Sequence, residues 1–143
     1  MTLKNTITLS MLSTSENVSV ARVTAAAFAA QADLTLNEIE EVKVAISEAI
    51  TNAVVHGYKE EKGQIELNIN LYEHLLEFIV TDHGTGIENI LEARKPSFST
   101  DPERMGLGFV FMESFMDVLE VESELGKGTR VRMVKKFGIN GTH

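Results

Sequence analysis

A carboxylate and an amide stand at helical spacing near the middle of the chain. Glu48, Asn52 and His56 are each four residues apart, so on an α-helix they share one face. The carbonyl oxygen of Asn52 suits a hard cation such as Mg²⁺, and Glu48 can orient a hydroxyl group or a water molecule for attack on a phosphate. An ordinary solvated helix face explains the same spacing, because charged rows of this kind are common.

A second motif, Asp82-His83-Gly84-Thr85-Gly86, directly follows a strand-like segment. Alternating glycines let a backbone turn sharply and pass close to a ligand. The Asp82 carboxylate can accept a hydrogen bond from an exocyclic amine such as that of adenine. The alternative is a tight turn that uses aspartate and glycine for backbone reasons alone.

A third motif, Gly106-Leu107-Gly108, immediately precedes an apolar segment that starts at Phe109. Glycine-lined amides at a helix N-terminus form an anion site, because free N–H groups and the positive end of the helix dipole point the same way. Phosphates are the expected ligand, although a plain helix-start loop explains the pattern about as well. Three basic residues flank this loop and could neutralise phosphate charge: Arg94, Lys95 and Arg104.

The elements that must position these residues follow from periodicity. Residues 3–11 alternate as a half-buried strand, and Ser13 with Glu16 has the spacing of a capping box for a helix to about Ala30. Thr35 and Glu38 repeat that signal, and the apolar stripe that follows predicts a helix ending near residues 56–57.

The second half of the chain predicts two hairpins and a helix. Residues 65–71 and 75–81 are strands, as are residues 118–123 and 129–135, which Gly126-Lys127-Gly128 joins. Between them, residues 87–105 hold both prolines and predict a mobile lid with a short helix around 88–94, before a buried helix over 107–116. Residues 138–143 lack periodicity and are expected to fray.

This order of elements predicts the fold class. Hairpin-joined strands with helices that can cover one face indicate a single α/β domain over residues 1–143. We expect a two-layer sandwich with a mixed, mainly antiparallel sheet.

Composition narrows the function. Hydrophobic residues make up 43% of the 143 residues, cysteine is absent, and no apolar run approaches the length that spans a bilayer. The chain is therefore expected to be cytoplasmic, without redox or disulfide chemistry. A net charge of −8 argues against nucleic acid and weakly favours a basic protein partner.

The four motifs in this order, ending with Gly128-Thr129 on a late strand, resemble the Bergerat-fold ATPases of the gyrase and histidine-kinase group. Further segments resemble the anti-sigma F factors of spore-forming bacteria, and this resemblance extends across nearly the whole chain. Examples are Ala21-Arg22-Val23-Thr24, His56-Gly57-Tyr58 and Met112-Glu113-Ser114-Phe115-Met116-Asp117. The resemblance implies a serine kinase that sequesters a sporulation sigma factor. It also implies that the kinase phosphorylates an anti-anti-sigma protein, and that the chain forms a homodimer through its first strand and helix.

The resemblance also assigns roles. It makes Glu48 the catalytic base, Asn52 the Mg²⁺ ligand and Asp82 the group that reads the adenine of ATP or ADP. The remaining nucleotide contacts are Gly84 and Gly86 at the purine, Gly106, Leu107 and Gly108 at the phosphates, Arg104 in the lid and Thr129 beside the adenine. Arg22 matches a partner-binding arginine, against the alternative of a solvated helix residue.

Two other functions remain open on the sequence. One is a non-catalytic regulatory module, in which the nucleotide only sets the shape that grips the sigma factor. The other is the ATPase half of a histidine kinase, which the lack of a dimerisation helix pair or phosphoacceptor segment within the 143 residues disfavours. His83 and Thr85 depart from what many relatives carry, and neither is expected to supply essential side-chain chemistry.

Overall fold

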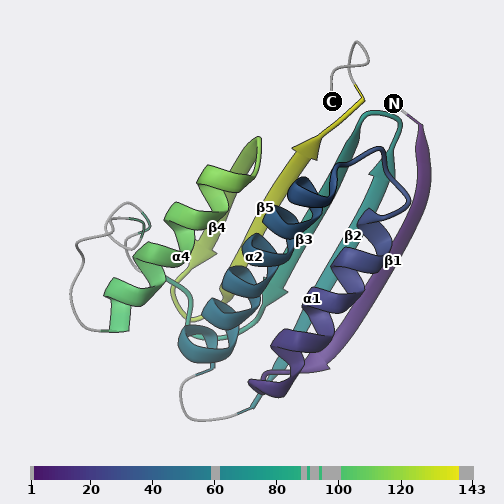
Figure 1. The fold of residues 1–143 in the computed structure, drawn as a ribbon. Helices are drawn as coiled ribbons and strands as arrows, with labels where there is room; N and C mark the ends of the chain where they lie inside the picture. Colours follow the sequence, from purple (N-terminus) through teal and green to yellow (C-terminus); the bar gives the residue numbers. More distant parts are fainter. Residues whose placement is uncertain (1, 59–61, 88–89, 91–93, 95–100, 139–143) are drawn as a thin grey trace.

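The fold is a five-stranded sheet with helices on one face (Figure 1). The computed structural model describes residues 2–58, 62–87, 90, 94 and 101–138, with the backbone alone over 101–105. The strands are β1 (Leu3–Leu12), β2 (Gln64–Tyr72), β3 (Leu75–Asp82), β4 (Val118–Glu124) and β5 (Gly128–Lys136). The order across the sheet is β1-β2-β3-β5-β4, and all four pairings are antiparallel. The predicted two-layer α/β class is confirmed, and the sheet of the described residues is antiparallel rather than mixed.

Three α-helices form the second layer: α1 (Glu16–Ala29), α2 (Leu36–Asn52) and α4 (Asp101–Phe115). Helix α2 lies between α1 and α4 over the same face of the sheet (Figure 1). The core fills the space between the layers, because alternate residues of β2 and β3 point toward the helices and are buried. Phe78 on β3 and Ile46 on α2 are among its largest fully buried side chains.

The opposite face of the sheet carries a polar network that crosses the strands. Asn70 donates to Glu77 (2.9 Å), and Arg132 donates to both Glu77 and Glu120. On the β1 side, Thr6 donates to Asn70 (2.6 Å). This face is therefore suited to water, which explains why it needs no helix layer.

The two predicted capping boxes have different outcomes. At α2, the Thr35 hydroxyl accepts from Glu38 N (3.1 Å) and the Glu38 carboxylate accepts from Thr35 N (2.9 Å), so this box is confirmed. The box at Ser13 is wrong: α1 begins at Glu16 with Ser15 as its N-cap residue, and no side chain caps it. Ser13 is instead buried, and its hydroxyl accepts from Gly63 N (3.0 Å).

The end of the second helix is wider than an α-helix. Helix α2 stops at Asn52, and a π-helical turn, η1 (Ala53–Gly57), continues it to the predicted end near residues 56–57. Such turns in helices are frequent at functional sites. This one brings its backbone carbonyls against the turn that follows β3.

Helix α4 begins earlier than the sequence predicts. It starts at Asp101, with Pro102 in its first turn, where a proline costs no intrahelical hydrogen bond. The motif Gly106-Leu107-Gly108 therefore lies inside α4, and the prediction that it forms a loop before the helix is wrong. The helix ends at Phe115, one residue before the predicted end.

Most of the predicted lid and the predicted frayed tail lie outside the described residues. Within the lid, Arg94 N donates to Ile90 O (3.0 Å), which is the spacing of one α-helical turn, and the Arg94 guanidinium contacts Glu113 on α4 (2.8 Å).

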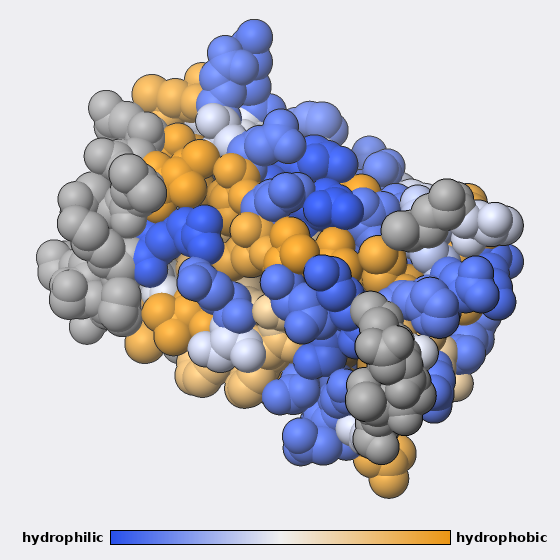
Figure 2. Space-filling view, turned by 90° about the horizontal axis from the view of Figure 1, so that it is seen from above, coloured by the Kyte–Doolittle hydropathy of each residue, from blue (hydrophilic) through white to orange (hydrophobic). Residues whose placement is uncertain are grey.

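In the part of the chain that is described, no helix is long and apolar enough to cross a membrane. Viewed from the end that carries both termini, hydrophobic and hydrophilic areas are interspersed on the surface (Figure 2).

Candidate functional site

A small cavity lies where α2 and η1, the end of β3, the start of β5 and helix α4 meet. Its volume is about 20 Å³, and it is lined by Ala49, Asn52, Ala53, His56, Gly57, Val80, Asp82, Gly86, Ile87, Phe109, Thr129 and Val131. Four predicted residues from three separate motifs thus share one cavity: Asn52, Asp82, Gly86 and Thr129. Most of the other walls are apolar, as expected where a flat base is to be bound.

Asp82 is the acidic group of this cavity. It is the last residue of β3 and only 5% exposed. Burial raises the pKa of the Asp82 carboxyl above its ordinary value, while hydrogen bonds from the backbone N–H groups of Gly84 and Thr129 act against that rise. The Gly84 bond measures 2.9 Å to Oδ1. Backbone contacts thus hold the carboxyl group at a fixed angle to the cavity.

The turn after Asp82 is held against the π-helical turn η1. Thr85 N donates to Gly57 O (2.7 Å), and the Thr85 hydroxyl donates to His56 O (3.1 Å). Gly84 permits this contact, because a Cβ at position 84 would lie 1.7 Å from Gly57 O. Glycine is therefore needed here for close approach of two backbone segments, which is the backbone reason given as the alternative for this motif. The expected contact of Gly84 with a purine stays a prediction.

Two further contacts fix the same turn. His83 N donates to the Tyr58 hydroxyl (2.7 Å), which itself donates to Gln64 O (2.7 Å). On the other side, Gly126 N donates to Thr85 O (2.7 Å). The turn is thus clamped between η1 and the β4–β5 hairpin.

Glu48 and Asn52 lie beneath Gly108 of helix α4. A Cβ at position 108 would be 3.1 Å from Glu48 Oε2 and 3.3 Å from both amide atoms of Asn52. Among the described side chains, Asn52 Nδ2 is the one buried polar atom without a hydrogen-bond partner. An orphaned buried amide is costly unless a ligand completes it. Rotation of the amide can present either its nitrogen or its carbonyl oxygen.

The residue types at this site suit Mg²⁺ bound beside nucleotide phosphates. Among the described residues, no group of three or more acidic, histidine or cysteine side chains could hold a metal by itself. Mg²⁺ commonly takes one or two protein ligands and completes its shell with water and substrate phosphates. Asn52 can serve as such a ligand, and Glu48, one helical turn away, can contact the group next to it.

The remaining predicted residues do not line the cavity. Leu107 lies on α4 with its side chain 45% exposed, and the side chain of Arg104 lies outside the described residues. Gly106 is a buried part of α4. In this state of the chain the three residues of the predicted phosphate loop contribute a helix rather than a ring of free amides.

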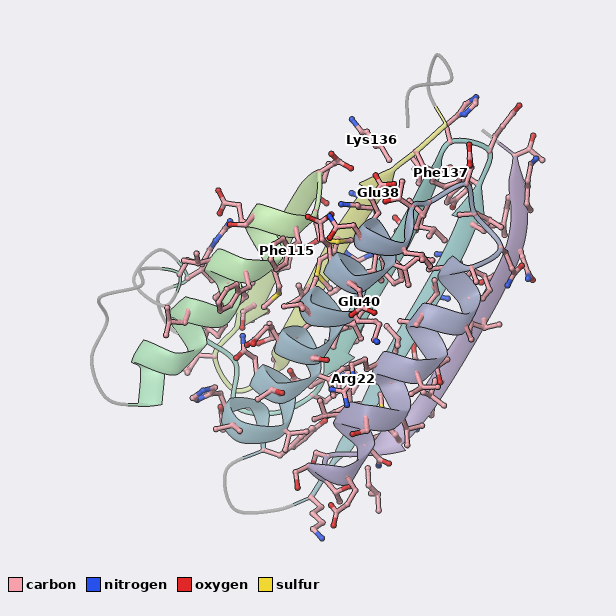
Figure 3. The ribbon with its side chains drawn as sticks, in the orientation of Figure 1. Arg22, Glu38, Glu40, Phe115, Lys136 and Phe137 are labelled. Atoms are coloured by element: carbon pink, nitrogen blue, oxygen red, sulfur yellow. The ribbon has the colours of Figure 1, made fainter. Side chains whose placement is uncertain are left out.

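Arg22 lies apart from the cavity, between helices α1 and α2 on the outer side of the helix layer (Figure 3). Its guanidinium donates to the hydroxyls of Ser47 (3.2 Å) and Ser19 (3.1 Å). The Ser47 hydroxyl in turn donates to Lys43 O (2.8 Å). Arg22 is thus held in a defined position next to the residue that precedes Glu48.

Several hydroxyl groups that hold the site together were missed by sequence reasoning. Tyr58, Thr85 and Ser123 each bind backbone atoms of the segments around the cavity. Serine and threonine recur along the chain, tyrosine occurs twice, and no spacing marks these three residues. Only the fold shows which backbone groups they contact.

A second, open hollow of about 320 Å³ lies next to the cavity and shares Asp82 and Thr129 with it. Its other lining residues include Glu122, Glu124, Lys127 and Arg130. These charged groups of both signs suit water and ions better than a purine. The apolar cavity is therefore the better candidate for the base.

Comparison with known proteins adds to this geometry. The model of the histidine kinase-like ATPase domain matches residues 11–135. A protein of Clostridium acetobutylicum named anti-sigma F factor is 49% identical over 139 residues, which cover 96% of this chain and 97% of the relative. A protein of the same name from Anoxybacillus flavithermus is 44% identical over 136 residues, which cover 93% of this chain and 93% of the relative.

A solved structure has the same fold. The histidine kinase domain of a blue-light activated histidine kinase from Erythrobacter litoralis matches with a TM-score of 0.57 at 16% identity. The match covers 86% of this chain and 60% of that one. At this identity the likeness concerns the fold alone.

Proposed function

The chain belongs to the anti-sigma F factors and carries a histidine kinase-like ATPase domain, and on that premise we propose that it sequesters a sporulation sigma factor and acts as a serine kinase. Its substrate is an anti-anti-sigma protein that otherwise releases the sigma factor. ATP provides the phosphate, and phosphorylation of one serine inactivates this antagonist. The nucleotide state of the chain thereby decides which of the two proteins it holds.

The observation that carries the proposal is the placement of Glu48 beside the orphaned amide of Asn52, next to the cavity with Asp82 in its wall. With the base against Asp82, the phosphates extend toward Asn52 and Gly108. The serine hydroxyl oxygen of the substrate then attacks the γ-phosphorus, and Glu48 accepts the proton of that hydroxyl. The bond between the γ-phosphorus and the oxygen of the β-phosphate breaks, and ADP leaves. Mg²⁺, held by Asn52 and the phosphates, would neutralise charge on the transferred group.

Replacement of Glu48 tests the kinase. The Glu48→Ala variant should lose transfer of labelled phosphate to the antagonist while it keeps its affinity for ATP, because the carboxylate acts on the serine and not on the base. Glu40→Ala is the matched control, since Glu40 is an exposed carboxylate two turns earlier on the same helix. Normal phosphoserine formation by Glu48→Ala would contradict the role of Glu48 as base.

The same assay separates the kinase from a non-catalytic module. A module of that kind would bind the sigma factor in a nucleotide-dependent way and form no phosphoserine on the antagonist. Capture of each partner by the immobilised chain with ATP and then with ADP measures the switch. Indifference of both partners to the nucleotide would contradict the regulatory cycle.

We further propose that the chain forms a homodimer through its first strand and helix. Strand β1 is ten residues long, and its outer edge has no partner strand in the part of the chain that is described. An open edge of that length favours pairing with another chain. On α1, the exposed Val20 and Val23 add apolar surface. Sedimentation equilibrium should give twice the 15.8 kDa mass of the chain.

A further inference from the structure

Ser123 links three segments around the cavity without lining it. It lies half-buried near the end of β4. Its hydroxyl accepts from Ile87 N (2.7 Å), contacts the Thr129 hydroxyl (2.8 Å) and donates to Gly128 O (2.9 Å). Ile87 and Thr129 both line the cavity, whereas Ser123 lines only the open hollow beside it. Any effect of Ser123 on a base bound in the cavity must therefore pass through these neighbours.

Counting protons shows what Ser123 does to Thr129. A serine hydroxyl has one hydrogen and can accept two hydrogen bonds. Ile87 N can only donate and Gly128 O can only accept. When all three contacts are made, the Ser123 O–H group therefore donates its hydrogen bond to Gly128 O. The Thr129 hydroxyl then donates to Ser123. Its own lone pairs remain available, and Thr129 faces a ligand as an acceptor.

Thr129 and Asp82 stand opposite one another in the pairing of β3 with β5. Both line the cavity, and Asp82 is also an acceptor when ionised. Two acceptors side by side match the two hydrogens of an exocyclic amine. A carbonyl oxygen at the same place would face acceptors only.

We propose that Ser123 is a positioning residue that orients the Thr129 hydroxyl and the Ile87 backbone for recognition of the exocyclic amine of adenine. The inference rests on the proposed function, because it requires that the base lies in the cavity against Asp82. It concerns selectivity for the base, and Ser123 itself does not touch the ligand. Removal of its hydroxyl leaves Thr129 free to rotate and to turn its proton toward the amine.

The test compares ATP with purine riboside triphosphate, which lacks the amine, by equilibrium binding to the full chain. Ser123→Ala should weaken ATP binding about fivefold, the effect of one hydrogen bond, and change binding of the analogue much less. Ser123→Thr keeps the hydroxyl and should restore the ratio of the two affinities. An equal loss for both nucleotides, or no loss, would overturn the inference.

Ser13→Ala is the matched control. The hydroxyl of Ser13, like that of Ser123, accepts a hydrogen bond from a backbone N–H group, that of Gly63, but Ser13 lines neither the cavity nor the hollow beside it. It should leave both affinities unchanged. If the unaltered chain binds neither nucleotide, the proposed function fails. If the unaltered chain binds ATP, and the Ser123→Ala variant binds each nucleotide as tightly as the unaltered chain does, then only the role of Ser123 fails.

Discussion

Two glycines near the cavity differ in what an added methyl group would meet. At Gly84 a Cβ would lie 1.7 Å from the backbone oxygen of Gly57, whereas at Gly126 nothing lies within 4 Å. Gly126 has a φ of +83°, so alanine there is strained by its own backbone conformation only. The two positions therefore separate a packing cost from a conformational cost.

We expect Gly84→Ala to lower the free energy of unfolding by about 3 kcal/mol or more, because two backbone segments must separate. Gly126→Ala should cost about 1 kcal/mol. Urea unfolding followed by circular dichroism measures both values. Similar losses for the two variants would contradict the close contact between the 82–86 turn and η1.

A second residue-scale prediction concerns pH and Glu77 on the open face of the sheet. Burial acts to raise the pKa of Glu77, but hydrogen bonds from Arg132 and Asn70 outweigh it, and the pKa lies below the ordinary value of 4.5. A carboxyl group with a lowered pKa in the folded state adds stability above the unfolded pKa, and that stability is lost as the pH falls through the folded pKa.

Glu77→Gln should therefore be less stable than the unaltered chain at pH 7, by about 1–2 kcal/mol, and the difference should shrink as the pH falls below about 4.5. Urea unfolding at a series of pH values measures it. Glu122→Gln is the control, because its ion pair with Arg130 is exposed and should contribute little at any pH. A difference that stays constant down to low pH would argue against the charged bond.

At the residue scale, the sequence predicts those site residues that belong to a motif with a recognisable spacing. Asn52, Asp82 and Gly84 follow from motif spacing, and the structure brings the first two to one cavity. No essential chemistry is expected of the Thr85 side chain, and the hydrogen bond from its hydroxyl to His56 O is a structural contact that the sequence did not predict. Such bonds depend on which backbone groups meet in the fold, and the sequence does not contain that information in any local pattern.

At the scale of elements, helix α4 is fastened at its C-terminal end. Lys135 of β5 is 8% exposed, and its ammonium group contacts Glu41 of α2 (3.1 Å) and donates to the last carbonyl of α4, that of Phe115 (2.7 Å). The last turn of α4 has no basic residue of its own. Lys135 thus provides the positive charge that the helix dipole favours there.

Lys135→Met keeps the length of the side chain but leaves Glu41 and the Phe115 carbonyl without this partner. We expect a loss of about 2 kcal/mol in the free energy of unfolding, measured in urea. The matched control is Lys43→Met, which removes an exposed ion pair with Glu40 and should change stability by about 0.5 kcal/mol or less. Equal effects of the two substitutions would mean that α4 is held by its apolar contacts alone.

The elements themselves were largely predictable, and α4 shows the limit. Alternation gives the strands and the apolar stripe gives α2, because both patterns reflect burial on one side. The start of α4 was placed six residues too late, at Leu107 instead of Asp101. Glycine is a poor helix former, so Gly106 and Gly108 suggested a loop. Packing of Gly108 against Glu48 and Asn52 overrides that preference.

At the scale of the molecule, the cavity and helix α4 restrict each other. A cavity of about 20 Å³ holds about one water molecule, whereas sites for small ligands measure roughly 300–1,000 Å³. Phe109 of α4 forms part of its wall and is 1% exposed. A nucleotide therefore cannot enter this state without movement of the wall. The order of elements predicts the fold class, but not this closed state, which depends on where one helix packs.

Nucleotide binding should consequently include a conformational step. In stopped-flow mixing with a fluorescent ATP analogue, the observed rate should level off at high concentration, because it becomes limited by the change of the protein and not by collision. Phe109→Leu shortens one wall of the cavity and should change the plateau rate, while Lys43→Met, remote from the cavity lining, should not. A rate that rises in proportion to nucleotide concentration for the unaltered chain, without a plateau, would mean that the cavity opens faster than ligand arrives. In that case helix α4 would not control access to Asp82, and its anchor at Lys135 would serve stability only.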